Sequence, residues 1–202
     1  MRALYYGGAF NPPTAAHIGL ADYVRKKLGY EKVIFMPSKR HYIEGDEGKD
    51  YAFSDEERYA MLQKIAANHP WMIVSDLEIR QAEQPRTYNT LCKLREQGYE
   101  LKLLIGSDWL SGLEHIWLHV PEIVSEFGIA VMARADDAVE EMISSDPYLS
   151  ALRSGLTVVE TPDTWKNASA SKVRAKMMEI RRLQDELKDM VPEELCGMKD
   201  YI

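Results

Sequence analysis

Short apolar runs that alternate with helix-like stretches are the feature of this sequence that most restricts its fold. The apolar runs cover residues 3–6, 32–36, 72–74, 101–105, 129–133 and 156–160. Between the first two runs, apolar residues recur at the spacing of one helix face, at Ile18, Ala21, Val24 and Leu28. Strands that alternate with helices are usually joined by crossover connections, so the pattern predicts a parallel sheet. We expect an α/β fold, a doubly wound parallel sheet with helices on both faces.

Local signals predict several boundaries of these elements. Ser54 to Glu57, "SDEE", has the form of a capping box and predicts a helix that runs to about Ala67. Gly29 and Gly98 follow helix-like stretches and are expected to end them. Residues 39–51 are polar and charged and contain glycines, which predicts an exposed loop.

The C-terminal part of the chain is predicted to be helical. We expect a long helix from Ser169 onward, with one apolar side formed by Val173, Met177, Ile180 and Leu187. The chain has 202 residues, which suits one domain, and 46% of them are apolar, which is enough for a core. We therefore expect a single domain over residues 1–202, in which about residues 169–202 form a small helical region.

The net charge of the chain disfavours some classes of function. Lys and Arg together number 25 and Asp and Glu 32, which gives a formal net charge of −7. A nucleic-acid-binding protein needs a basic face that displaces counterions from phosphates, so this class is disfavoured. A small phosphorylated ligand stays compatible with the charge, because a few well-placed cations are enough to bind it.

Cysteine content and hydropathy indicate the compartment. The cysteines, Cys92 and Cys196, lie far apart in the sequence and show no metal-ligand spacing. No apolar run reaches the roughly 18 residues that a membrane span needs, and the first residues lack the apolar region of a signal peptide. We expect a cytoplasmic protein without a disulfide framework, a metal site or a membrane partner.

The stretch "YYGGAFNPPTAAH", residues 5–17, is the first candidate for a ligand site. A predicted strand ends at a double glycine, and a predicted helix begins near Ala15. In a doubly wound sheet, ligands bind beyond the carboxyl ends of the strands, and a helix N-terminus presents N–H groups to an anion. Thr14 is a natural N-cap, and His17 could donate to a phosphate oxygen. Taken alone, the stretch is more simply interpreted as a capping threonine and a surface histidine.

The stretch "SASKVR", residues 169–174, is the second candidate. Ser171 could offer its hydroxyl and N–H to an anion, and Arg174 lies one turn further on, near the same helix face. Taken alone, this stretch is more simply an ordinary serine cap with a solvated arginine. Together, the two stretches would place two helix N-termini around one anion, which suits a triphosphate attacked at its α-phosphorus. The dinucleotide fingerprint G-x-G-x-x-G is absent, so hydride transfer is disfavoured.

The two stretches also resemble the signatures of a known enzyme superfamily. "GGAFNPPTAAH" resembles the GG-(S/T)-F-(D/N)-P-x-(H/T)-x-G-H signature of the nucleotidylyltransferases, and "SASKVR" resembles their I-S-S-T-x-(I/V)-R signature. The order and separation of the two stretches fit as well. The resemblance implies a Rossmann-like fold and the transfer of a nucleotidyl group from a nucleoside triphosphate.

Further segments resemble one branch, the nicotinate mononucleotide adenylyltransferases. "DLEIRQAEQPRTYNTLCKL" (76–94) resembles their E-x-x-R-x-x-x-S-Y-T-x-D-T-L segment, and "LLIGSDWLSGLEHIW" (103–117) resembles their I-G-x-D followed by a tryptophan. "IAVMAR" (129–134) resembles their next strand and arginine, and "VPEELCGMKDYI" (191–202) their closing V-P-x-x-V-x-x-Y-I. The resemblance implies transfer of AMP from ATP to nicotinate mononucleotide, which gives deamido-NAD and pyrophosphate in NAD biosynthesis.

Some residues depart from the pattern of this branch. Thr14 stands where histidine is usual, and Ala16 replaces a glycine. Ala9 and Ala170 replace hydroxyl-bearing residues, and Pro85-Arg86 stands where Ser-Tyr is usual. Threonine is found at the position of Thr14 in phosphopantetheine adenylyltransferases, so an alternative acceptor is phosphopantetheine or another small molecule. The alanines motivate a second alternative, a nucleotide-binding protein with impaired catalysis.

The resemblance implies roles around the phosphates of ATP. His17 would bind the α-phosphate with Thr14 beside it, and Ser171 and Arg174 would hold the β- and γ-phosphates. His17, Thr14 and Arg174 are the expected catalytic residues. Mg²⁺ would enter with ATP and bridge its phosphates, mostly through water and without a dedicated protein cage.

The resemblance also implies contacts to the rest of both substrates. Further ATP contacts would come from Gly8, Ala9, Phe10, Gly106 and Asp108. Contacts to the mononucleotide would come from Thr87, Trp117, Lys39 and Arg134, with Trp117 stacked on the pyridine ring. The usual Pro-His-Lys after the second strand is not clear here, so Lys39, Arg40 and His41 are all candidates for reaching the phosphates. The sequence leaves open a homo-oligomer and the choice between nicotinate and nicotinamide mononucleotide.

Overall fold

The fold is seen in a computed structural model that describes residues 1–45, 52–133, 137–165, 168–188 and 190. The strands of this part of the chain are β1 (Arg2–Gly8), β2 (Lys32–Pro37), β3 (Met72–Val74), β4 (Glu100–Gly106), β5 (Ile129–Ala133) and β6 (Leu156–Glu160). Its α-helices are α1 (Ala15–Leu28), α2 (Arg40–Glu44), α3 (Asp55–Ala66), α4 (Thr87–Glu96), α5 (Leu113–Ile116), α6 (Val120–Glu126), α7 (Val139–Ser145), α8 (Pro147–Ala151) and α9 (Ala170–Lys188). Short 3₁₀ turns are η1 (Ser107–Gly112), η2 (Arg153–Gly155) and η3 (Asp163–Trp165).

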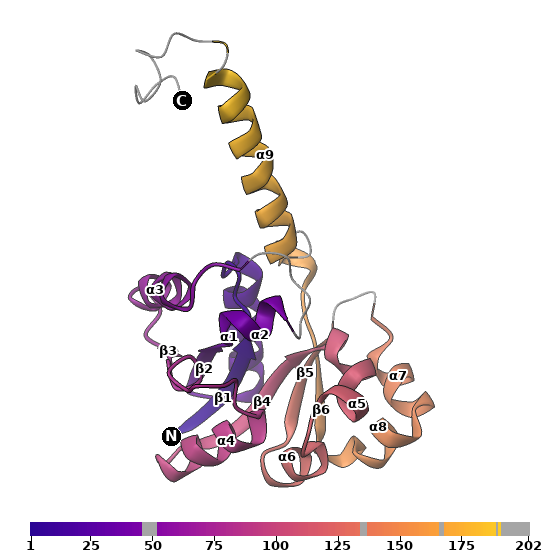
Figure 1. The fold of residues 1–202 in the computed structure, drawn as a ribbon. Coiled ribbons are helices and arrows are strands. Elements are labelled where there is room, and N and C mark those ends of the chain that lie inside the picture. The colour runs from indigo at the N-terminus through magenta and orange to yellow at the C-terminus, as the bar shows by residue number, and fades with distance from the viewer. Residues whose placement is uncertain (46–51, 134–136, 166–167, 189, 191–202) are drawn as a thin grey trace.

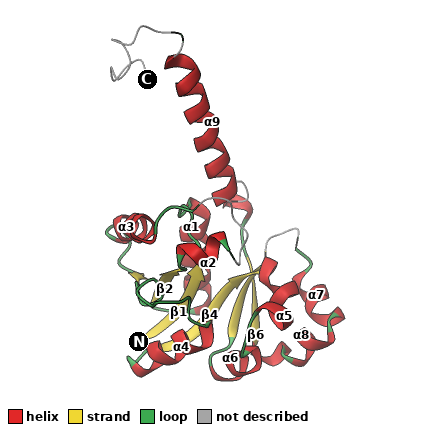
Figure 2. Cartoon of the chain, viewed as in Figure 1, coloured by secondary structure: helices red, strands yellow, loops and turns green. Residues whose placement is uncertain are grey.

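The strands form one parallel sheet in the order β3-β2-β1-β4-β5-β6. The chain winds outward from β1 in one direction, returns to the centre, and winds outward from β4 in the other direction (Figures 1 and 2). The predicted α/β fold, a Rossmann-like doubly wound parallel sheet, is confirmed. The reversal between β1 and β4 matters for function, because a crevice opens between loops that leave neighbouring strands in opposite directions.

Alternate residues of each strand face opposite sides of the sheet. Tyr5 and Leu103 belong to a core beneath α4 and the helices from α5 to α8, whereas Leu4 and Leu104 belong to a core beneath α1 and α3. Side chains of a strand alternate between its two faces, so a strand covered on both sides is apolar at every position. This explains the continuous apolar runs in the sequence.

Most predicted boundaries agree with the structure. Gly29 follows α1 with a φ of 68°, and Gly98 follows α4 with a φ of 89°, both in the left-handed region that suits glycine. The helix that Gly98 follows, α4, begins at Thr87. The prediction of a loop over residues 39–51 is wrong for α2, because Ile43 is fully buried and anchors a short helix there.

The predicted long C-terminal helix corresponds to α9, which extends away from the sheet (Figure 1). Exposed apolar residues of α9 include Met178, Ile180, Leu183 and Leu187. Residues 191–202, the remainder of the predicted helical region, lie outside the described residues. Among the helices that the structure describes, none is long and apolar enough to span a membrane.

The predicted capping box at the start of α3 is present. The Ser54 hydroxyl accepts a hydrogen bond from the Glu57 N–H at 3.1 Å, and the Glu57 carboxylate accepts one from the Ser54 N–H at 2.8 Å. The N–H groups of Ser54 and Glu57 therefore find acceptors within the same four residues.

Replacing Ser54 with alanine removes the acceptor for the Glu57 N–H. We expect Ser54→Ala to lower the free energy of unfolding by about 1 kcal/mol, the usual contribution of an N-cap side chain. Urea denaturation followed by circular dichroism measures this change. Ser54→Thr keeps the acceptor and serves as the control, with a loss of at most a few tenths of a kcal/mol expected. Equal losses in both variants would contradict the capping role.

Candidate active site

A cavity of about 660 Å³ opens beyond the carboxyl ends of β1 and β4. Gly7 and Gly8 line it at the end of β1, and Ile105 and Gly106 line it at the end of β4. The cavity lies at the reversal of strand order, where ligands bind in doubly wound folds. Its volume is in the range of small-molecule sites.

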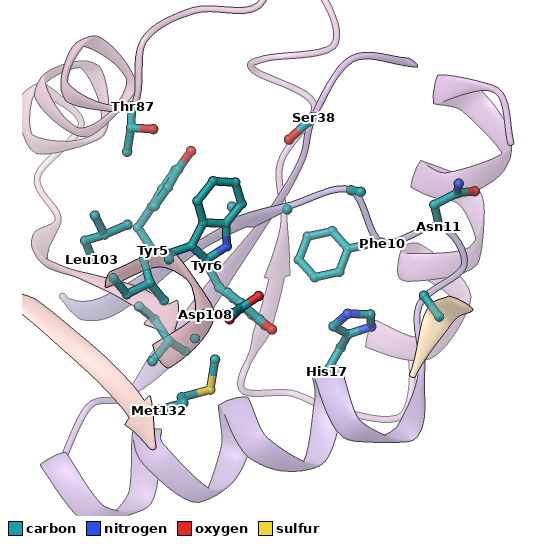
Figure 3. A pocket seen from close by; sticks show the side chains of 18 of the residues that line it. Tyr5, Tyr6, Phe10, Asn11, His17, Ser38, Thr87, Leu103, Asp108 and Met132 are labelled. Carbon is teal, nitrogen blue, oxygen red and sulfur yellow. The ribbon is translucent and has the colours of Figure 1, made fainter. Parts of the chain in front are cut away.

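The first turn of α1 presents His17 to this cavity. The His17 Nδ1 accepts a hydrogen bond from the Thr14 backbone N–H at 3.0 Å, and the Thr14 hydroxyl accepts one from the His17 N–H at 3.3 Å. Because Nδ1 is an acceptor, the neutral ring carries its proton on Nε2. The ring also packs edge-on against Phe10, with centroids 5.3 Å apart. In Figure 3, the His17 side chain leaves α1 and points into the cavity.

Thr14 lies behind His17 and is not among the residues that line the cavity. Its side chain is buried, and its hydroxyl donates to the Ala168 carbonyl at 3.3 Å. Ala168 directly precedes the second signature stretch. Thr14 thus joins the two stretches and holds His17. Its N–H and its hydroxyl form hydrogen bonds with His17 and Ala168.

Ser171 and Arg174 reach the same cavity from the first two turns of α9. The Arg174 Nη1 donates to the Asn11 carbonyl at 2.6 Å, and its Nη2 donates to the Ser171 hydroxyl at 3.2 Å. Asn11 is itself buried, and its side-chain oxygen accepts from the Phe53 N–H at 3.0 Å. Two stretches that lie more than 150 residues apart are therefore brought together at one wall.

A fully buried arginine, Arg58 of α3, holds the turn that follows β1. Its guanidinium donates to the Ala9 carbonyl at 2.8 Å, the Ser38 carbonyl at 2.5 Å and the Phe53 carbonyl at 3.1 Å. It also pairs with the Asp55 carboxylate. The sequence gives no signal for this role, because an arginine in the first turn of a capped helix is usually exposed.

The opposite end of the cavity contains a buried carboxyl, Glu78. It accepts hydrogen bonds from the Tyr5 hydroxyl at 2.6 Å, the Thr90 hydroxyl at 2.8 Å and the Gln84 amide at 2.6 Å. Burial raises the pKa of the Glu78 carboxyl, although these hydrogen bonds act in the opposite direction. Burial, and then the charge of Glu78, raise the pKa of the Tyr5 hydroxyl well above its usual value. The network joins β1 to the first turns of α4.

Thr87 and Trp117 also line the cavity, and Figure 3 shows Thr87 near Tyr5. Thr87 is the first residue of α4, so its N–H is one of the unbonded groups of a helix N-terminus. Trp117 packs edge-on against Trp109, with ring centroids 5.6 Å apart. Figure 3 shows Thr87 on the opposite side of the cavity from His17, with Asp108 between them.

The remaining predicted site residues divide into three groups. Gly8, Ala9, Phe10, Gly106 and Asp108 all line the cavity. Lys39 does not line it, because its ammonium group donates to the Ile79 and Gln81 carbonyls at 2.9 and 2.7 Å. Of the alternatives to Lys39, His41 lines the cavity and Arg40 pairs with Glu44. Arg134 lies outside the described residues.

Comparison with known proteins identifies the family. The family model described as cytidylyltransferase-like matches residues 5–176. The chain belongs to the cytidylyltransferase-like family. A protein of Roseiflexus sp. named "Probable nicotinate-nucleotide adenylyltransferase" is 29% identical over 186 residues, which cover 92% of this chain and 90% of that protein. A protein of the same name from Dehalococcoides mccartyi is 28% identical over 174 residues, which cover 85% of this chain and 82% of that protein.

Solved structures extend this likeness to the fold. The Plasmodium falciparum nicotinic acid mononucleotide adenylyltransferase complexed with NaAD superposes with a TM-score of 0.62 and 20% identity, over 80% of this chain and 75% of that one. The same enzyme complexed with APC gives a TM-score of 0.61 at 19% identity, over the same shares of the two chains. The resemblance to nicotinate mononucleotide adenylyltransferases that the sequence indicated is confirmed by the curated relatives.

Removing the Arg58 guanidinium leaves several buried carbonyl groups without a donor. We expect Arg58→Gln to lower the free energy of unfolding by about 3 kcal/mol, as is typical when one partner of a buried charged network is lost. Urea denaturation measures the change. The control is Arg153→Gln, because Arg153 forms an exposed ion pair with Glu140, for which a loss below about 1 kcal/mol is expected. Similar losses in the two variants would refute the role of Arg58.

Proposed function

We propose that this protein transfers AMP from ATP to nicotinate mononucleotide and releases pyrophosphate, a step of NAD biosynthesis. The observation that carries the proposal is the meeting of the two signature stretches, with His17, Ser171 and Arg174, at one cavity. The names of its curated relatives support the same reaction. The proposal includes a cytoplasmic location, where ATP and mononucleotides are available together.

The reaction needs no protein nucleophile. A phosphate oxygen of the mononucleotide attacks the α-phosphorus of ATP and forms a new P–O bond. The bond from the α-phosphorus to the oxygen that bridges to the β-phosphorus breaks, and pyrophosphate leaves with the electron pair. Catalysis consists of holding the two phosphates in line and stabilising the charge that develops on the oxygens.

The hydrogen-bond donors of the cavity wall suit this task. In the proposal, the His17 Nε2–H donates to an oxygen of the α-phosphate, because its Nδ1 is already bound by Thr14. Arg174 and Ser171 hold the β- and γ-phosphates of the leaving group. The partners of Arg174 among the described residues are a carbonyl and a hydroxyl, which orient the guanidinium without neutralising its charge.

Mg²⁺ belongs to the proposal as a companion of ATP. The described residues include no group of three His, Cys, Asp or Glu side chains that could hold a metal ion. A cation held mainly by phosphate oxygens and water fits such a wall, since Mg²⁺ keeps several of its waters when it binds with nucleotides. It would supply charge neutralisation on the triphosphate.

The acceptor occupies the other end of the cavity in this proposal. Trp117 stacks on the pyridine ring, and Thr87 at the start of α4 contacts its carboxylate or amide. Phosphopantetheine as the acceptor was suggested by Thr14, but Thr14 does not line the cavity and the relatives carry the name of the other enzyme. Nicotinate mononucleotide is therefore the acceptor that we propose.

Pyrophosphate release tests the proposed function directly. We expect release with ATP, Mg²⁺ and nicotinate mononucleotide, and the same assay with nicotinamide mononucleotide defines the preference for acid or amide. Phosphopantetheine is the negative control. Tight ATP binding without pyrophosphate for any of the three acceptors would refute the proposal and favour a binding protein.

Replacing His17 with alanine removes a donor to the reacting phosphate. We expect His17→Ala to lower kcat by about 100-fold or more, the usual effect of removing one donor to a developing oxyanion, with an unchanged circular dichroism spectrum. Steady-state kinetics at saturating substrates measures it. Turnover close to that of the unmodified protein would remove His17 from the mechanism.

Replacing Trp117 tests the pyridine end separately. We expect Trp117→Ala to raise the KM for the mononucleotide on the order of 10-fold, because aromatic stacking on a base contributes about that much, while the KM for ATP stays nearly constant. Initial rates with one substrate varied at a time measure both values. Equal rises for the two substrates would count against stacking on the pyridine ring.

A further inference from the structure

Trp165, in η3 directly after β6, packs closely against α1. At Gly19 of α1, a Cβ atom would lie only 2.3 Å from the Cε2 and Cζ2 atoms of the indole. Real side chains do not approach so closely, so the indole can occupy this place only because residue 19 is glycine. Glycine inside a helix costs about 1 kcal/mol relative to alanine. The packing of Trp165 explains why glycine, otherwise unfavourable in a helix, stands at position 19.

The indole is half-buried and lines the cavity. Other apolar residues that line the cavity are Leu20 of α1, Met132 of β5 and Pro162. Figure 3 shows Met132 far from Thr87 and on the side of the cavity where α1 runs. The cavity therefore has an indole beside α1 in addition to those of Trp109 and Trp117.

The groups that suit phosphates belong to the wall that carries the two signature stretches. His17 projects from α1 two residues before Gly19, and Arg174 reaches the same wall from α9. The next turn of α1 lies only about 5 Å along the helix axis from His17, so the base of a nucleotide whose phosphates bind at this wall can reach that turn. Leu20 and the indole of Trp165 lie at that turn.

We propose that Trp165 stacks on the base of the nucleoside triphosphate and that Gly19 provides the room for it. The inference rests on the proposed function, of which it names the base-binding residue. An indole face binds any base, but a purine covers more of it than a pyrimidine does. Trp165 would therefore contribute to the preference for ATP over CTP, a choice that the family description leaves open.

The experiment compares Trp165→Leu and Trp165→Phe with the unmodified protein. The affinity for α,β-methylene ATP is measured by calorimetry, which does not depend on turnover. We expect Trp165→Leu to weaken it on the order of 10-fold, the usual size of base–aromatic stacking, and Trp165→Phe to weaken it less. The KM for nicotinate mononucleotide should change less than twofold, and the ratio of kcat/KM between ATP and CTP should fall.

Trp71→Leu is the matched control, because Trp71 is also half-buried but lies against Phe35 and Arg25 and does not line the cavity. This variant loses an indole outside the cavity, so any effect comes through the stability of the protein. We expect its affinity for the ATP analogue to be unchanged. Gly19→Ala is a second test, since the added methyl group displaces the indole. It should weaken binding of the analogue in the same direction as Trp165→Leu while α1 keeps its helical signal.

Unchanged affinity for the analogue in both Trp165→Leu and Gly19→Ala would overturn the inference. An equal loss for the analogue and for the mononucleotide would overturn it as well, because stacking on one base predicts unequal effects. The proposed function fails on a different result. If the unmodified protein yields no pyrophosphate but Trp165→Leu still weakens the analogue, the base-binding role stands and the proposed reaction does not.

Discussion

The candidate site depends on one buried cation, the guanidinium of Arg58. A chain that turns sharply after a central strand exposes backbone carbonyl groups, which need donors once they are buried. Arg58 supplies donors to the Ala9 carbonyl, at the end of β1, and to the Ser38 carbonyl, at the end of β2. One side chain therefore ties together two neighbouring strand ends. The path of the turn after β1 decides where α1 begins and where the ring of His17 points.

The second half of the site is attached to the first by contacts with neutral groups. Arg174 binds the Asn11 carbonyl, and the Thr14 hydroxyl binds the Ala168 carbonyl. A carboxylate in place of these carbonyls would hold the arginine more strongly but would cancel its charge. Neutral acceptors position the cation and leave its field directed at the cavity, which is what a wall for phosphates requires.

The sequence predicted the parts of the molecule that follow from local rules. Strands buried on both faces, a capping box at Ser54 and a glycine after α1 each have a short-range cause. The roles of Arg58 and Glu78 could not be predicted, because their partners lie up to 73 residues away and only the fold brings them together. For Lys39 the distant partners act against the prediction. Its ammonium group, which the sequence offered as a ligand contact, donates to two carbonyls about 40 residues away. The short helices between β4 and β6 were also missed, because a helix of four to seven residues is held by packing and leaves little periodicity.

The meaning of Thr14 changes once its contacts are known. From the sequence, a threonine in place of histidine suggests either a tuned or a weakened phosphate contact. In the structure, the Thr14 N–H donates to Nδ1 of His17. The Thr14 hydroxyl accepts from the His17 N–H, which caps α1, and donates to the Ala168 carbonyl. Each polar group of Thr14 that these bonds involve is used to orient His17 or to join α1 to the segment before α9. In the proposed reaction, a residue with this set of partners would act by positioning His17, so its replacement would change the site through the placement of that ring.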